Sequence, residues 1–190
     1  MLKMSSNIYN HFDIKLKELI TKINNHKSSV FCLTILKDGR LISGSYDKSI
    51  IIYNKKTFKP EITIREHFGG INCITTLSSG ILASCSFDNT IKLFNIKDNN
   101  YDILQTLNDH TNEVYKIIEL KNKSLVSCSD DKSIIFYNKD NNNKYKQYYK
   151  LNTKGYCCSV IETKDNEICY SESHNTIYFY DLLQKKKYQK

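Results

Sequence analysis

An internal repeat constrains the fold of this chain more than any other feature. Three segments share one fourteen-residue pattern: "LISGSYDKSIIIYN" from 41 to 54, "LASCSFDNTIKLFN" from 82 to 95 and "LVSCSDDKSIIFYN" from 125 to 138. An aspartate in the pattern recurs after 41 and then 43 residues, and a histidine lies 21 residues before each aspartate. These positions are Asp47, Asp88 and Asp131, and His26, His67 and His110. Such a period predicts stacked copies of one small structural unit.

Each unit has the pattern of short β-strands. In the first unit the apolar runs are "SSVFCLTIL", "LISGS", "SIIIYN" and "EITIRE". Turn residues separate them, first Lys37-Asp38-Gly39 and then Tyr46-Asp47-Lys48. Four short strands in about 42 residues are typical of one blade of a β-propeller.

The recurring histidine and aspartate are predicted to bind each other. Both lie beside apolar strands, where a polar group without a partner is costly. A serine of the second strand would complete the hydrogen-bond chain. Two sets share that strand face, and the pattern does not separate Ser43, Ser84 and Ser127 from Ser45, Ser86 and Ser129.

These motifs resemble the WD40 repeat family, through the histidine that opens each unit and the "S-G/C-S-x-D-x-S/T-I" core with its closing aromatic pair. The resemblance implies a structural tetrad of histidine, serine, aspartate and aromatic residue in each unit. The tetrads would be His26, Ser43, Asp47 and Tyr53; His67, Ser84, Asp88 and Phe94; and His110, Ser127, Asp131 and Tyr137. The family's Trp-Asp ending is replaced by Tyr-Asn or Phe-Asn. Because Phe94 has no hydroxyl group, the second tetrad is expected to be a triad.

A fourth unit from Thr153 to Asp181 is more degenerate. Thr153 replaces the histidine and His174 the aspartate, while "TIYFYD" from Thr176 still matches the third strand. The expected organisation is a WD40 repeat domain over 19–190, with repeats near 26–66, 67–109, 110–152 and 153–190. Residues 1–18 precede it as an N-terminal arm or a short amphipathic helix.

Four units are fewer than the seven or so of a typical WD40 ring. The fold class expected is therefore all-β, with about four four-stranded antiparallel blades forming an arc or partial ring. Leu19–Ile23 resembles the outer strand of a blade, which in closed rings often completes the last blade. Three alternatives remain: a fragment of a longer propeller, which we favour, a ring completed by a second subunit, or a four-bladed ring. An open arc leaves its end blades exposed.

Composition narrows the class of protein. The 40% hydrophobic content supports a packed core, and the formal net charge is +8. Arg40 and Arg65 are the only arginines, whereas nucleic-acid readers favour arginine, so an AT-rich genome explains the lysines better than nucleic-acid binding does. Seven cysteines without a CxxC pair indicate free thiols in a reducing compartment, and no metal or cofactor is expected. Without a signal-peptide pattern, we expect a cytoplasmic protein, with the nucleus as an alternative.

Serine, histidine and aspartate occur in each of the three well-matched units. Three copies of one set of residues indicate a structural role rather than a catalytic site. We therefore expect a non-enzymatic scaffold that docks proteins or peptides, with a nucleic-acid-associated propeller as the alternative and an enzyme with a ring-centre pocket as a third. By their offsets from the tetrads, the resemblance implies a partner-binding face at Tyr46, Phe87, Asp130, Phe31, Glu113, Tyr115 and Tyr156. For Phe31, packing against a neighbouring blade is an equal alternative. Aromatic residues among polar ones are typical of binding hot spots.

Overall fold

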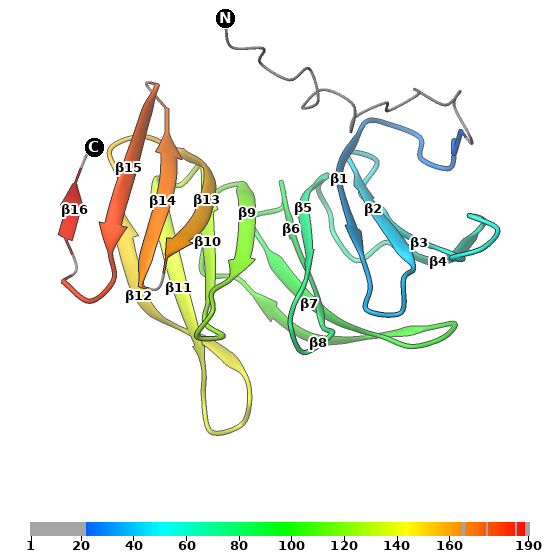
Figure 1. Cartoon of the computed structure of the whole chain (residues 1–190). Helices are drawn as coiled ribbons and strands as arrows, with labels where there is room; N and C mark the ends of the chain where they lie inside the picture. Colours follow the sequence, from blue (N-terminus) through cyan, green and yellow to red (C-terminus); the bar gives the residue numbers. More distant parts are fainter. Residues whose placement is uncertain (1–21, 165, 174, 185, 189–190) are drawn as a thin grey trace, which may run out of the picture.

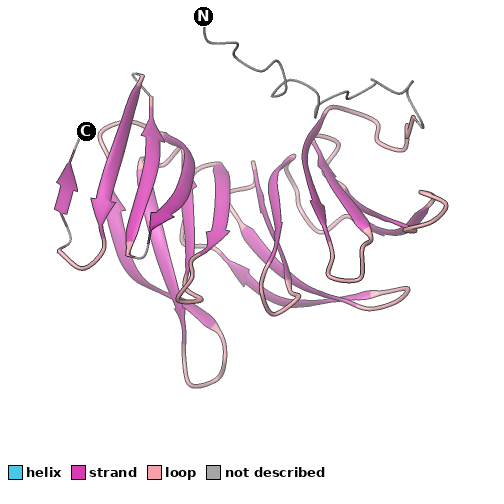
Figure 2. Ribbon diagram, viewed as in Figure 1, coloured by secondary structure: helices cyan, strands magenta, loops and turns pink. Residues whose placement is uncertain are grey.

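The computed structural model describes residues 22–164, 166–173, 175–184 and 186–188. Every regular element in these ranges is a β-strand (Figure 2). The first two sheets contain β1 (Val30–Ile35), β2 (Leu41–Ser45), β3 (Ile50–Tyr53) and β4 (Pro60–Ile64), then β5 (Ile71–Thr76), β6 (Leu82–Ser86), β7 (Ile91–Ile96) and β8 (Tyr101–Leu107). The other two contain β9 (Val114–Glu119), β10 (Leu125–Ser129), β11 (Ser133–Lys139) and β12 (Tyr145–Asn152), then β13 (Cys157–Lys164), β14 (Glu167–Glu172), β15 (Thr176–Asp181) and β16 (Lys186–Tyr188).

Each sheet is a four-stranded antiparallel meander whose strands pair in chain order. The four sheets stand one after another in an open arc, with the first strands β1, β5, β9 and β13 next to one another along it (Figure 1). The first and fourth sheets do not close the arc into a ring. The prediction of an all-β protein with four four-stranded antiparallel blades is thus confirmed.

The turns explain why one pattern produces the same hairpins three times. In the β2–β3, β6–β7 and β10–β11 turns the residue after the repeat aspartate has a positive φ, 70° at Lys48, 69° at Asn89 and 59° at Lys132. In the β1–β2 and β5–β6 turns the left-handed position is a glycine, Gly39 or Gly80. Glycine adopts this conformation without steric cost, which makes these turns tight.

The apolar cores lie between the sheets rather than inside one of them. The core between the first and second sheets contains Ile42, Ile52, Ile71, Leu82 and Phe94. The next contains Cys85, Leu93, Ile117, Ile135 and Tyr137, and the last contains Val126, Phe136, Val160, Ile168 and Tyr170. Each fully buried side chain of this size stabilises the fold by roughly 1.5–3 kcal/mol. The repeat therefore obtains its stability from stacking.

Hydrogen bonds between neighbouring sheets recur at the turns opposite the histidine loops. The backbone N–H and hydroxyl of Ser78 donate to Glu119 over 2.6 and 2.9 Å. One sheet further along, the backbone N–H of Lys121 donates to Glu162 over 2.9 Å. Such repeated contacts join consecutive blades at equivalent points.

The two ends of the arc expose apolar positions that are buried elsewhere. Val30 and Leu33 on β1 are 48% and 63% exposed, whereas their counterparts Ile71 and Ile74 on β5 are at most 5% exposed. At the other end Ile177 on β15 is 57% exposed. Its counterpart on β11, Ile134, is fully buried by the fourth sheet. Among the described residues no further sheet covers either end.

Two expectations concern segments that are wholly or partly undescribed. The N-terminal arm or helix of residues 1–18 lies outside the described ranges. For the proposed outer strand at Leu19–Ile23, only Lys22 and Ile23 are described, and neither lies in a strand. The fourth strand of the last sheet is β16, from the C-terminal side of the chain. No described segment forms a helix of the length and apolar character needed to span a membrane.

Candidate functional site

The first repeat joins its four predicted tetrad residues in one hydrogen-bond chain. His26 Nδ1 lies 3.1 Å from Asp47 Oδ2, and His26 Nε2 lies 2.6 Å from the Ser43 hydroxyl. The Ser43 hydroxyl is in turn 3.0 Å from the Tyr53 hydroxyl. With the carboxylate accepting from Nδ1–H, Nε2 accepts from Ser43. The histidine loop before β1 is thereby tied to β2, β3 and the turn between them.

The second repeat is a triad, because Phe94 has no hydroxyl. His67 lies 2.8 Å from Asp88 and 2.7 Å from Ser84. Phe94 is completely buried and packs edge-on against Tyr101, with 5.9 Å between ring centroids. The position that holds the hydrogen-bonding Tyr53 in the first repeat therefore contributes only through packing in the second repeat.

In the third repeat His110 lies 2.9 Å from Asp131 and 2.7 Å from Ser127. The aromatic member differs from the prediction, because the buried Tyr137 hydroxyl makes no hydrogen bond of good geometry. Burial raises the pKa of Tyr137, and the nearby Ser127 hydroxyl opposes this shift. Tyr137 therefore contributes through packing in the core between the second and third sheets.

The structure separates the two serine sets that the pattern left open. Ser43, Ser84 and Ser127 bind the histidines, whereas Ser45, Ser86 and Ser129 accept the backbone N–H of the repeat aspartates over 3.0–3.1 Å. Sequence reasoning missed a further hydroxyl two residues after each aspartate, which donates to its second carboxylate oxygen. These residues are Ser49, Thr90 and Ser133. The recurring "D-x-S/T" spacing was the available signal.

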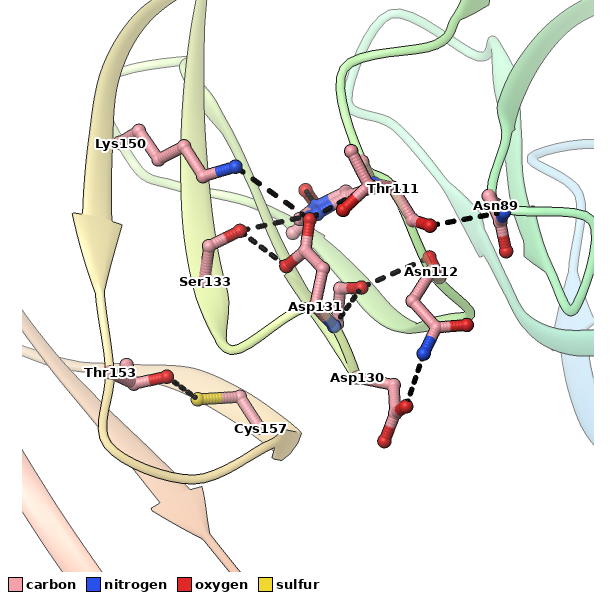
Figure 3. A network of polar contacts seen from close by, with 12 residues as sticks. Asn89, Thr111, Asn112, Asp130, Asp131, Ser133, Lys150, Thr153 and Cys157 are labelled. Carbon is pink, nitrogen blue, oxygen red and sulfur yellow. Dashed lines mark hydrogen bonds and ion pairs between the residues drawn. The ribbon is translucent and has the colours of Figure 1, made fainter.

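Adjacent aspartates in the third repeat have different surroundings (Figure 3). Asp131 accepts from Ser133 and from the backbone N–H of Thr111, and Lys150 lies 3.7 Å from it. Asp130 is directed away from this network and accepts only from Asn112 in the view of Figure 3. Asp131 thus belongs to the hydrogen-bond network inside the third repeat, whereas Asp130 belongs to the surface.

Hydrogen bonds link serine to histidine and histidine to aspartate, as in the catalytic triads of hydrolases. The burial of these side chains nevertheless argues for a structural role. Ser84 and Ser127 are fully buried, and His67 and His110 are only 5% exposed. A substrate carbonyl therefore has no access to the hydroxyl groups of Ser84 and Ser127. Among the described residues, no group of three or more histidine, cysteine or acidic side chains is arranged to hold a metal ion.

The repeat aspartates predict a stability that depends on pH. Burial by itself raises the pKa of Asp88 and Asp131, but hydrogen bonds from His67 and Thr90, and from His110 and Ser133, hold both pKa values well below the usual range. A depressed pKa contributes stability above the unfolded value, about 3.9, which is lost as the pH falls toward the folded value. We expect the melting temperature to fall steeply below about pH 4. Thermal denaturation between neutral and acidic pH checks this. A flat profile would contradict it.

The fourth repeat replaces the tetrad with other contacts. Thr153 donates to the carbonyl of Gly155 over 2.7 Å. It also accepts from Cys157 at 3.5 Å (Figure 3). Tyr170 occupies the serine position of this repeat and is buried, with Lys187 near its ring. Its hydroxyl has no hydrogen-bond partner in the described structure. His174 lies outside the described residues.

All seven cysteines are free thiols. Cys85 and Cys128 fill the slot that Gly44 occupies in the first repeat, where a Cβ atom would lie 2.7 Å from both Cys32 Sγ and a methyl carbon of Ile71. Cys157 is buried while Cys158 is exposed, as expected for adjacent residues on opposite faces of a strand. The thiols therefore act mainly as small core residues.

Four equivalent backbone hydrogen bonds align the predicted partner-binding residues on the face that carries the histidine loops. Along the arc they run from Tyr46 to Ser29, Phe87 to Gly70, Asp130 to Glu113 and Ser173 to Tyr156, over 2.9–3.0 Å. Each joins the residue before the repeat aspartate, or its counterpart, to the loop before the first strand. We call the surface formed by these residues, together with Phe31 and Tyr115, the docking face, after the role that the sequence predicts for it.

An aromatic cluster occupies the docking face of the first two blades. Phe31, Tyr46 and Phe87 contact one another with ring centroids 5.5–6.2 Å apart. Phe31 and Tyr46 remain 50% and 54% exposed. Gly70 lies beneath the rings, where a Cβ atom would approach Tyr46 to 2.9 Å. Phe31 therefore combines both predicted roles, since it packs against the second blade and keeps half of its surface free.

One exposed aromatic residue in the loop between β4 and β5 was missed by sequence reasoning. Phe68 is 86% exposed and follows the tetrad histidine His67, and its backbone N–H donates to Asp88 over 2.8 Å. Lys27 and Thr111 occupy the same position in the other repeats. Its offset from the histidine was the available signal.

The docking face of the third blade is acidic. Burial, then the negative charges of Asp130 and Glu113, raise the pKa of Tyr115 to about 12. Among the described residues, no lysine or arginine forms an ion pair with either carboxylate. Tyr156, on the fourth blade, is 44% exposed. The structure therefore brings all seven predicted partner-binding residues to one face, in an aromatic and an acidic part.

Comparisons with known proteins agree with this architecture. The model of the WD domain, G-beta repeat, matches residues 17–54, 58–95 and 101–138, more than half of the chain. Curated proteins yield no match. Among solved structures, the chain is similar to the WD40 beta propeller domain of Doa1, with 24% identity and a TM-score of 0.72 over 81% of this chain and 51% of that one. The chain thus spans about half of that structure. By its three matched repeats and its stacked four-stranded blades, the chain belongs to the WD40 repeat family.

Proposed function

We propose that this protein is a non-catalytic scaffold that docks a protein or peptide partner on its docking face. WD40 propellers are typically protein-interaction scaffolds and generally lack catalytic activity. The observation that carries the proposal for this chain is the cluster of Phe31, Tyr46 and Phe87, in which the first two rings are half-exposed and Phe87 is partly buried. Aromatic side chains that are preorganised by mutual contact lose little entropy on binding and often dominate an interface.

The test compares two double variants after a partner has been captured from the source cell. Tyr46→Ala/Phe87→Ala is expected to weaken binding by about 2 kcal/mol or more, which is close to thirtyfold. Lys55→Ala/Lys56→Ala alters exposed residues of the β3–β4 loop, away from the docking face, and should change affinity little. Isothermal titration, with melting curves as a check on folding, measures both.

The opposite result would favour the nucleic-acid alternative. Loss of binding only in the lysine variant, with affinity that falls steeply as salt rises, indicates phosphate contacts. The two carboxylates of the docking face, Glu113 and Asp130, do not favour that alternative, because they repel phosphate groups.

The end faces fit a different kind of partner, namely further propeller blades. Val30, Leu33 and Ile177 occupy register positions that a neighbouring blade buries inside the arc. A sheet from a longer chain or a second subunit would bury them in the same way. Light scattering of the 190-residue chain tests whether a second subunit supplies this sheet, because a stable dimer would have twice the mass of the monomer.

A further inference from the structure

The two parts of the docking face have complementary properties that define the partner more closely. The backbone bonds at Tyr46, Phe87 and Asp130 place these residues at equivalent points of three consecutive blades. A segment lying along the arc would therefore meet the aromatic cluster first and the acidic part of the third blade next. The inference below rests on the proposed function of this face.

No lysine or arginine of the described chain pairs with the carboxylates of the acidic part. Asp130 accepts a hydrogen bond from the neutral Asn112 side chain over 2.5 Å. Its neighbour Asp131, in contrast, has His110 at 2.9 Å and Lys150 at 3.7 Å. In a chain with a net charge of +8, lysines are abundant, yet none forms an ion pair with Glu113 or Asp130 among the described residues.

The acidic part also lies against a partly buried aromatic ring. Tyr115 is half-buried and packs against the core between the third and fourth blades. Its pKa is raised to about 12, by burial first and by Asp130 and Glu113 next. Carboxylates beside an aromatic ring favour a cationic group, through charge-assisted hydrogen bonds and contact with the ring face.

We propose that the docking face binds a partner-protein segment that carries an apolar side chain and, one blade further along, a lysine or arginine. The apolar side chain would pack on Phe31, Tyr46 and Phe87. The cation would bind between Glu113 and Asp130, against Tyr115. The net charge of +8 of the whole chain disfavours a generally basic partner, so the cation is a local feature of an otherwise neutral or acidic segment.

Peptides selected from a random library by binding to the 190-residue chain provide the probes, and fluorescence anisotropy measures their affinities. The selected peptides should share an apolar residue and a basic residue at a constant separation. Replacing that basic residue by glutamine is expected to weaken binding roughly tenfold, since a hydrogen bond to a charged group is lost. Glu113→Gln/Asp130→Asn should have the same effect. Because both changes remove one interaction, their combination should cost little more than either alone.

The outcomes separate this inference from the proposed function. Binders that lose affinity with Tyr46→Ala/Phe87→Ala but not with Glu113→Gln/Asp130→Asn would overturn the cationic requirement and leave the docking face intact. Binders indifferent to both double variants, or a library without binders, would count against the docking face itself. Melting curves check that Glu113→Gln/Asp130→Asn, which replaces each carboxylate by an amide of nearly the same shape, remains folded.

Discussion

Replacing Ile134 by alanine is expected to lower the free energy of unfolding by about 2–5 kcal/mol. Ile134 lies on β11, is completely buried, and belongs to the core between the third and fourth blades. The substitution removes three methyl or methylene carbons from a space closed by strands of two sheets, which cannot collapse to fill it. Urea denaturation measures the change.

Ile177 provides the matched control. It occupies the same position of the fourth repeat, opposite Ser171 on the neighbouring strand, but is 57% exposed. In the monomeric chain, Ile177→Ala should lower the free energy of unfolding by less than about 1 kcal/mol. The reason is that the Ile177 side chain already lies largely in water and buries little apolar surface on folding. Equal losses at Ile134 and Ile177 in a verified monomer would refute the assignment of stability to the stacking of blades.

Loss of the Asp131 side chain is expected to destabilise the third blade by roughly 1–3 kcal/mol. Asp131 accepts from His110, from Ser133 and from the backbone N–H of Thr111. In Asp131→Ala the buried His110 and Ser133 donors lose this acceptor. Asp47→Ala should behave alike, because Asp47 accepts from His26, Ser49 and the backbone N–H of Lys27.

The neighbouring residue supplies the comparison for this prediction. Asp130→Ala removes a carboxylate from the same turn, but Asp130 is only partly buried and accepts one side-chain hydrogen bond, from Asn112. Its expected effect on thermal stability is within about 0.5 kcal/mol. An unchanged melting temperature in both Asp47→Ala and Asp131→Ala would show that the buried networks do not stabilise the blades.

The sequence by itself determined the repeated unit. Alternating apolar residues between turn signals predicted four strands per unit, because the strand period and turn chemistry are local properties. The spacing of 21 residues between His110 and Asp131 predicted their hydrogen bond, because three copies of one spacing reveal a shared contact. The missing hydroxyl of Phe94 likewise followed from residue identity alone.

Tertiary structure decided the features that depend on distance and direction. Which serine reaches the histidine, Ser43 or Ser45, depends on their positions along β2, because both serines lie on the same face of that strand. The tertiary structure also decides that the Tyr53 hydroxyl binds Ser43 while the Tyr137 hydroxyl makes no hydrogen bond of good geometry, because the two residues have the same type and the same place in the repeat.

The docking face also combines features that the sequence predicted with features that only the tertiary structure decided. The offsets of Phe31, Tyr46 and Phe87 from their repeat residues predicted a common side of the arc. Only the stacking of the first two blades brings the three rings into mutual contact, because they belong to two units about 40 residues apart along the chain. The acidic part likewise becomes distinct once the structure shows that Lys150 approaches Asp131 rather than Asp130. Local pattern determines which residues repeat, whereas packing between repeats determines which of them meet.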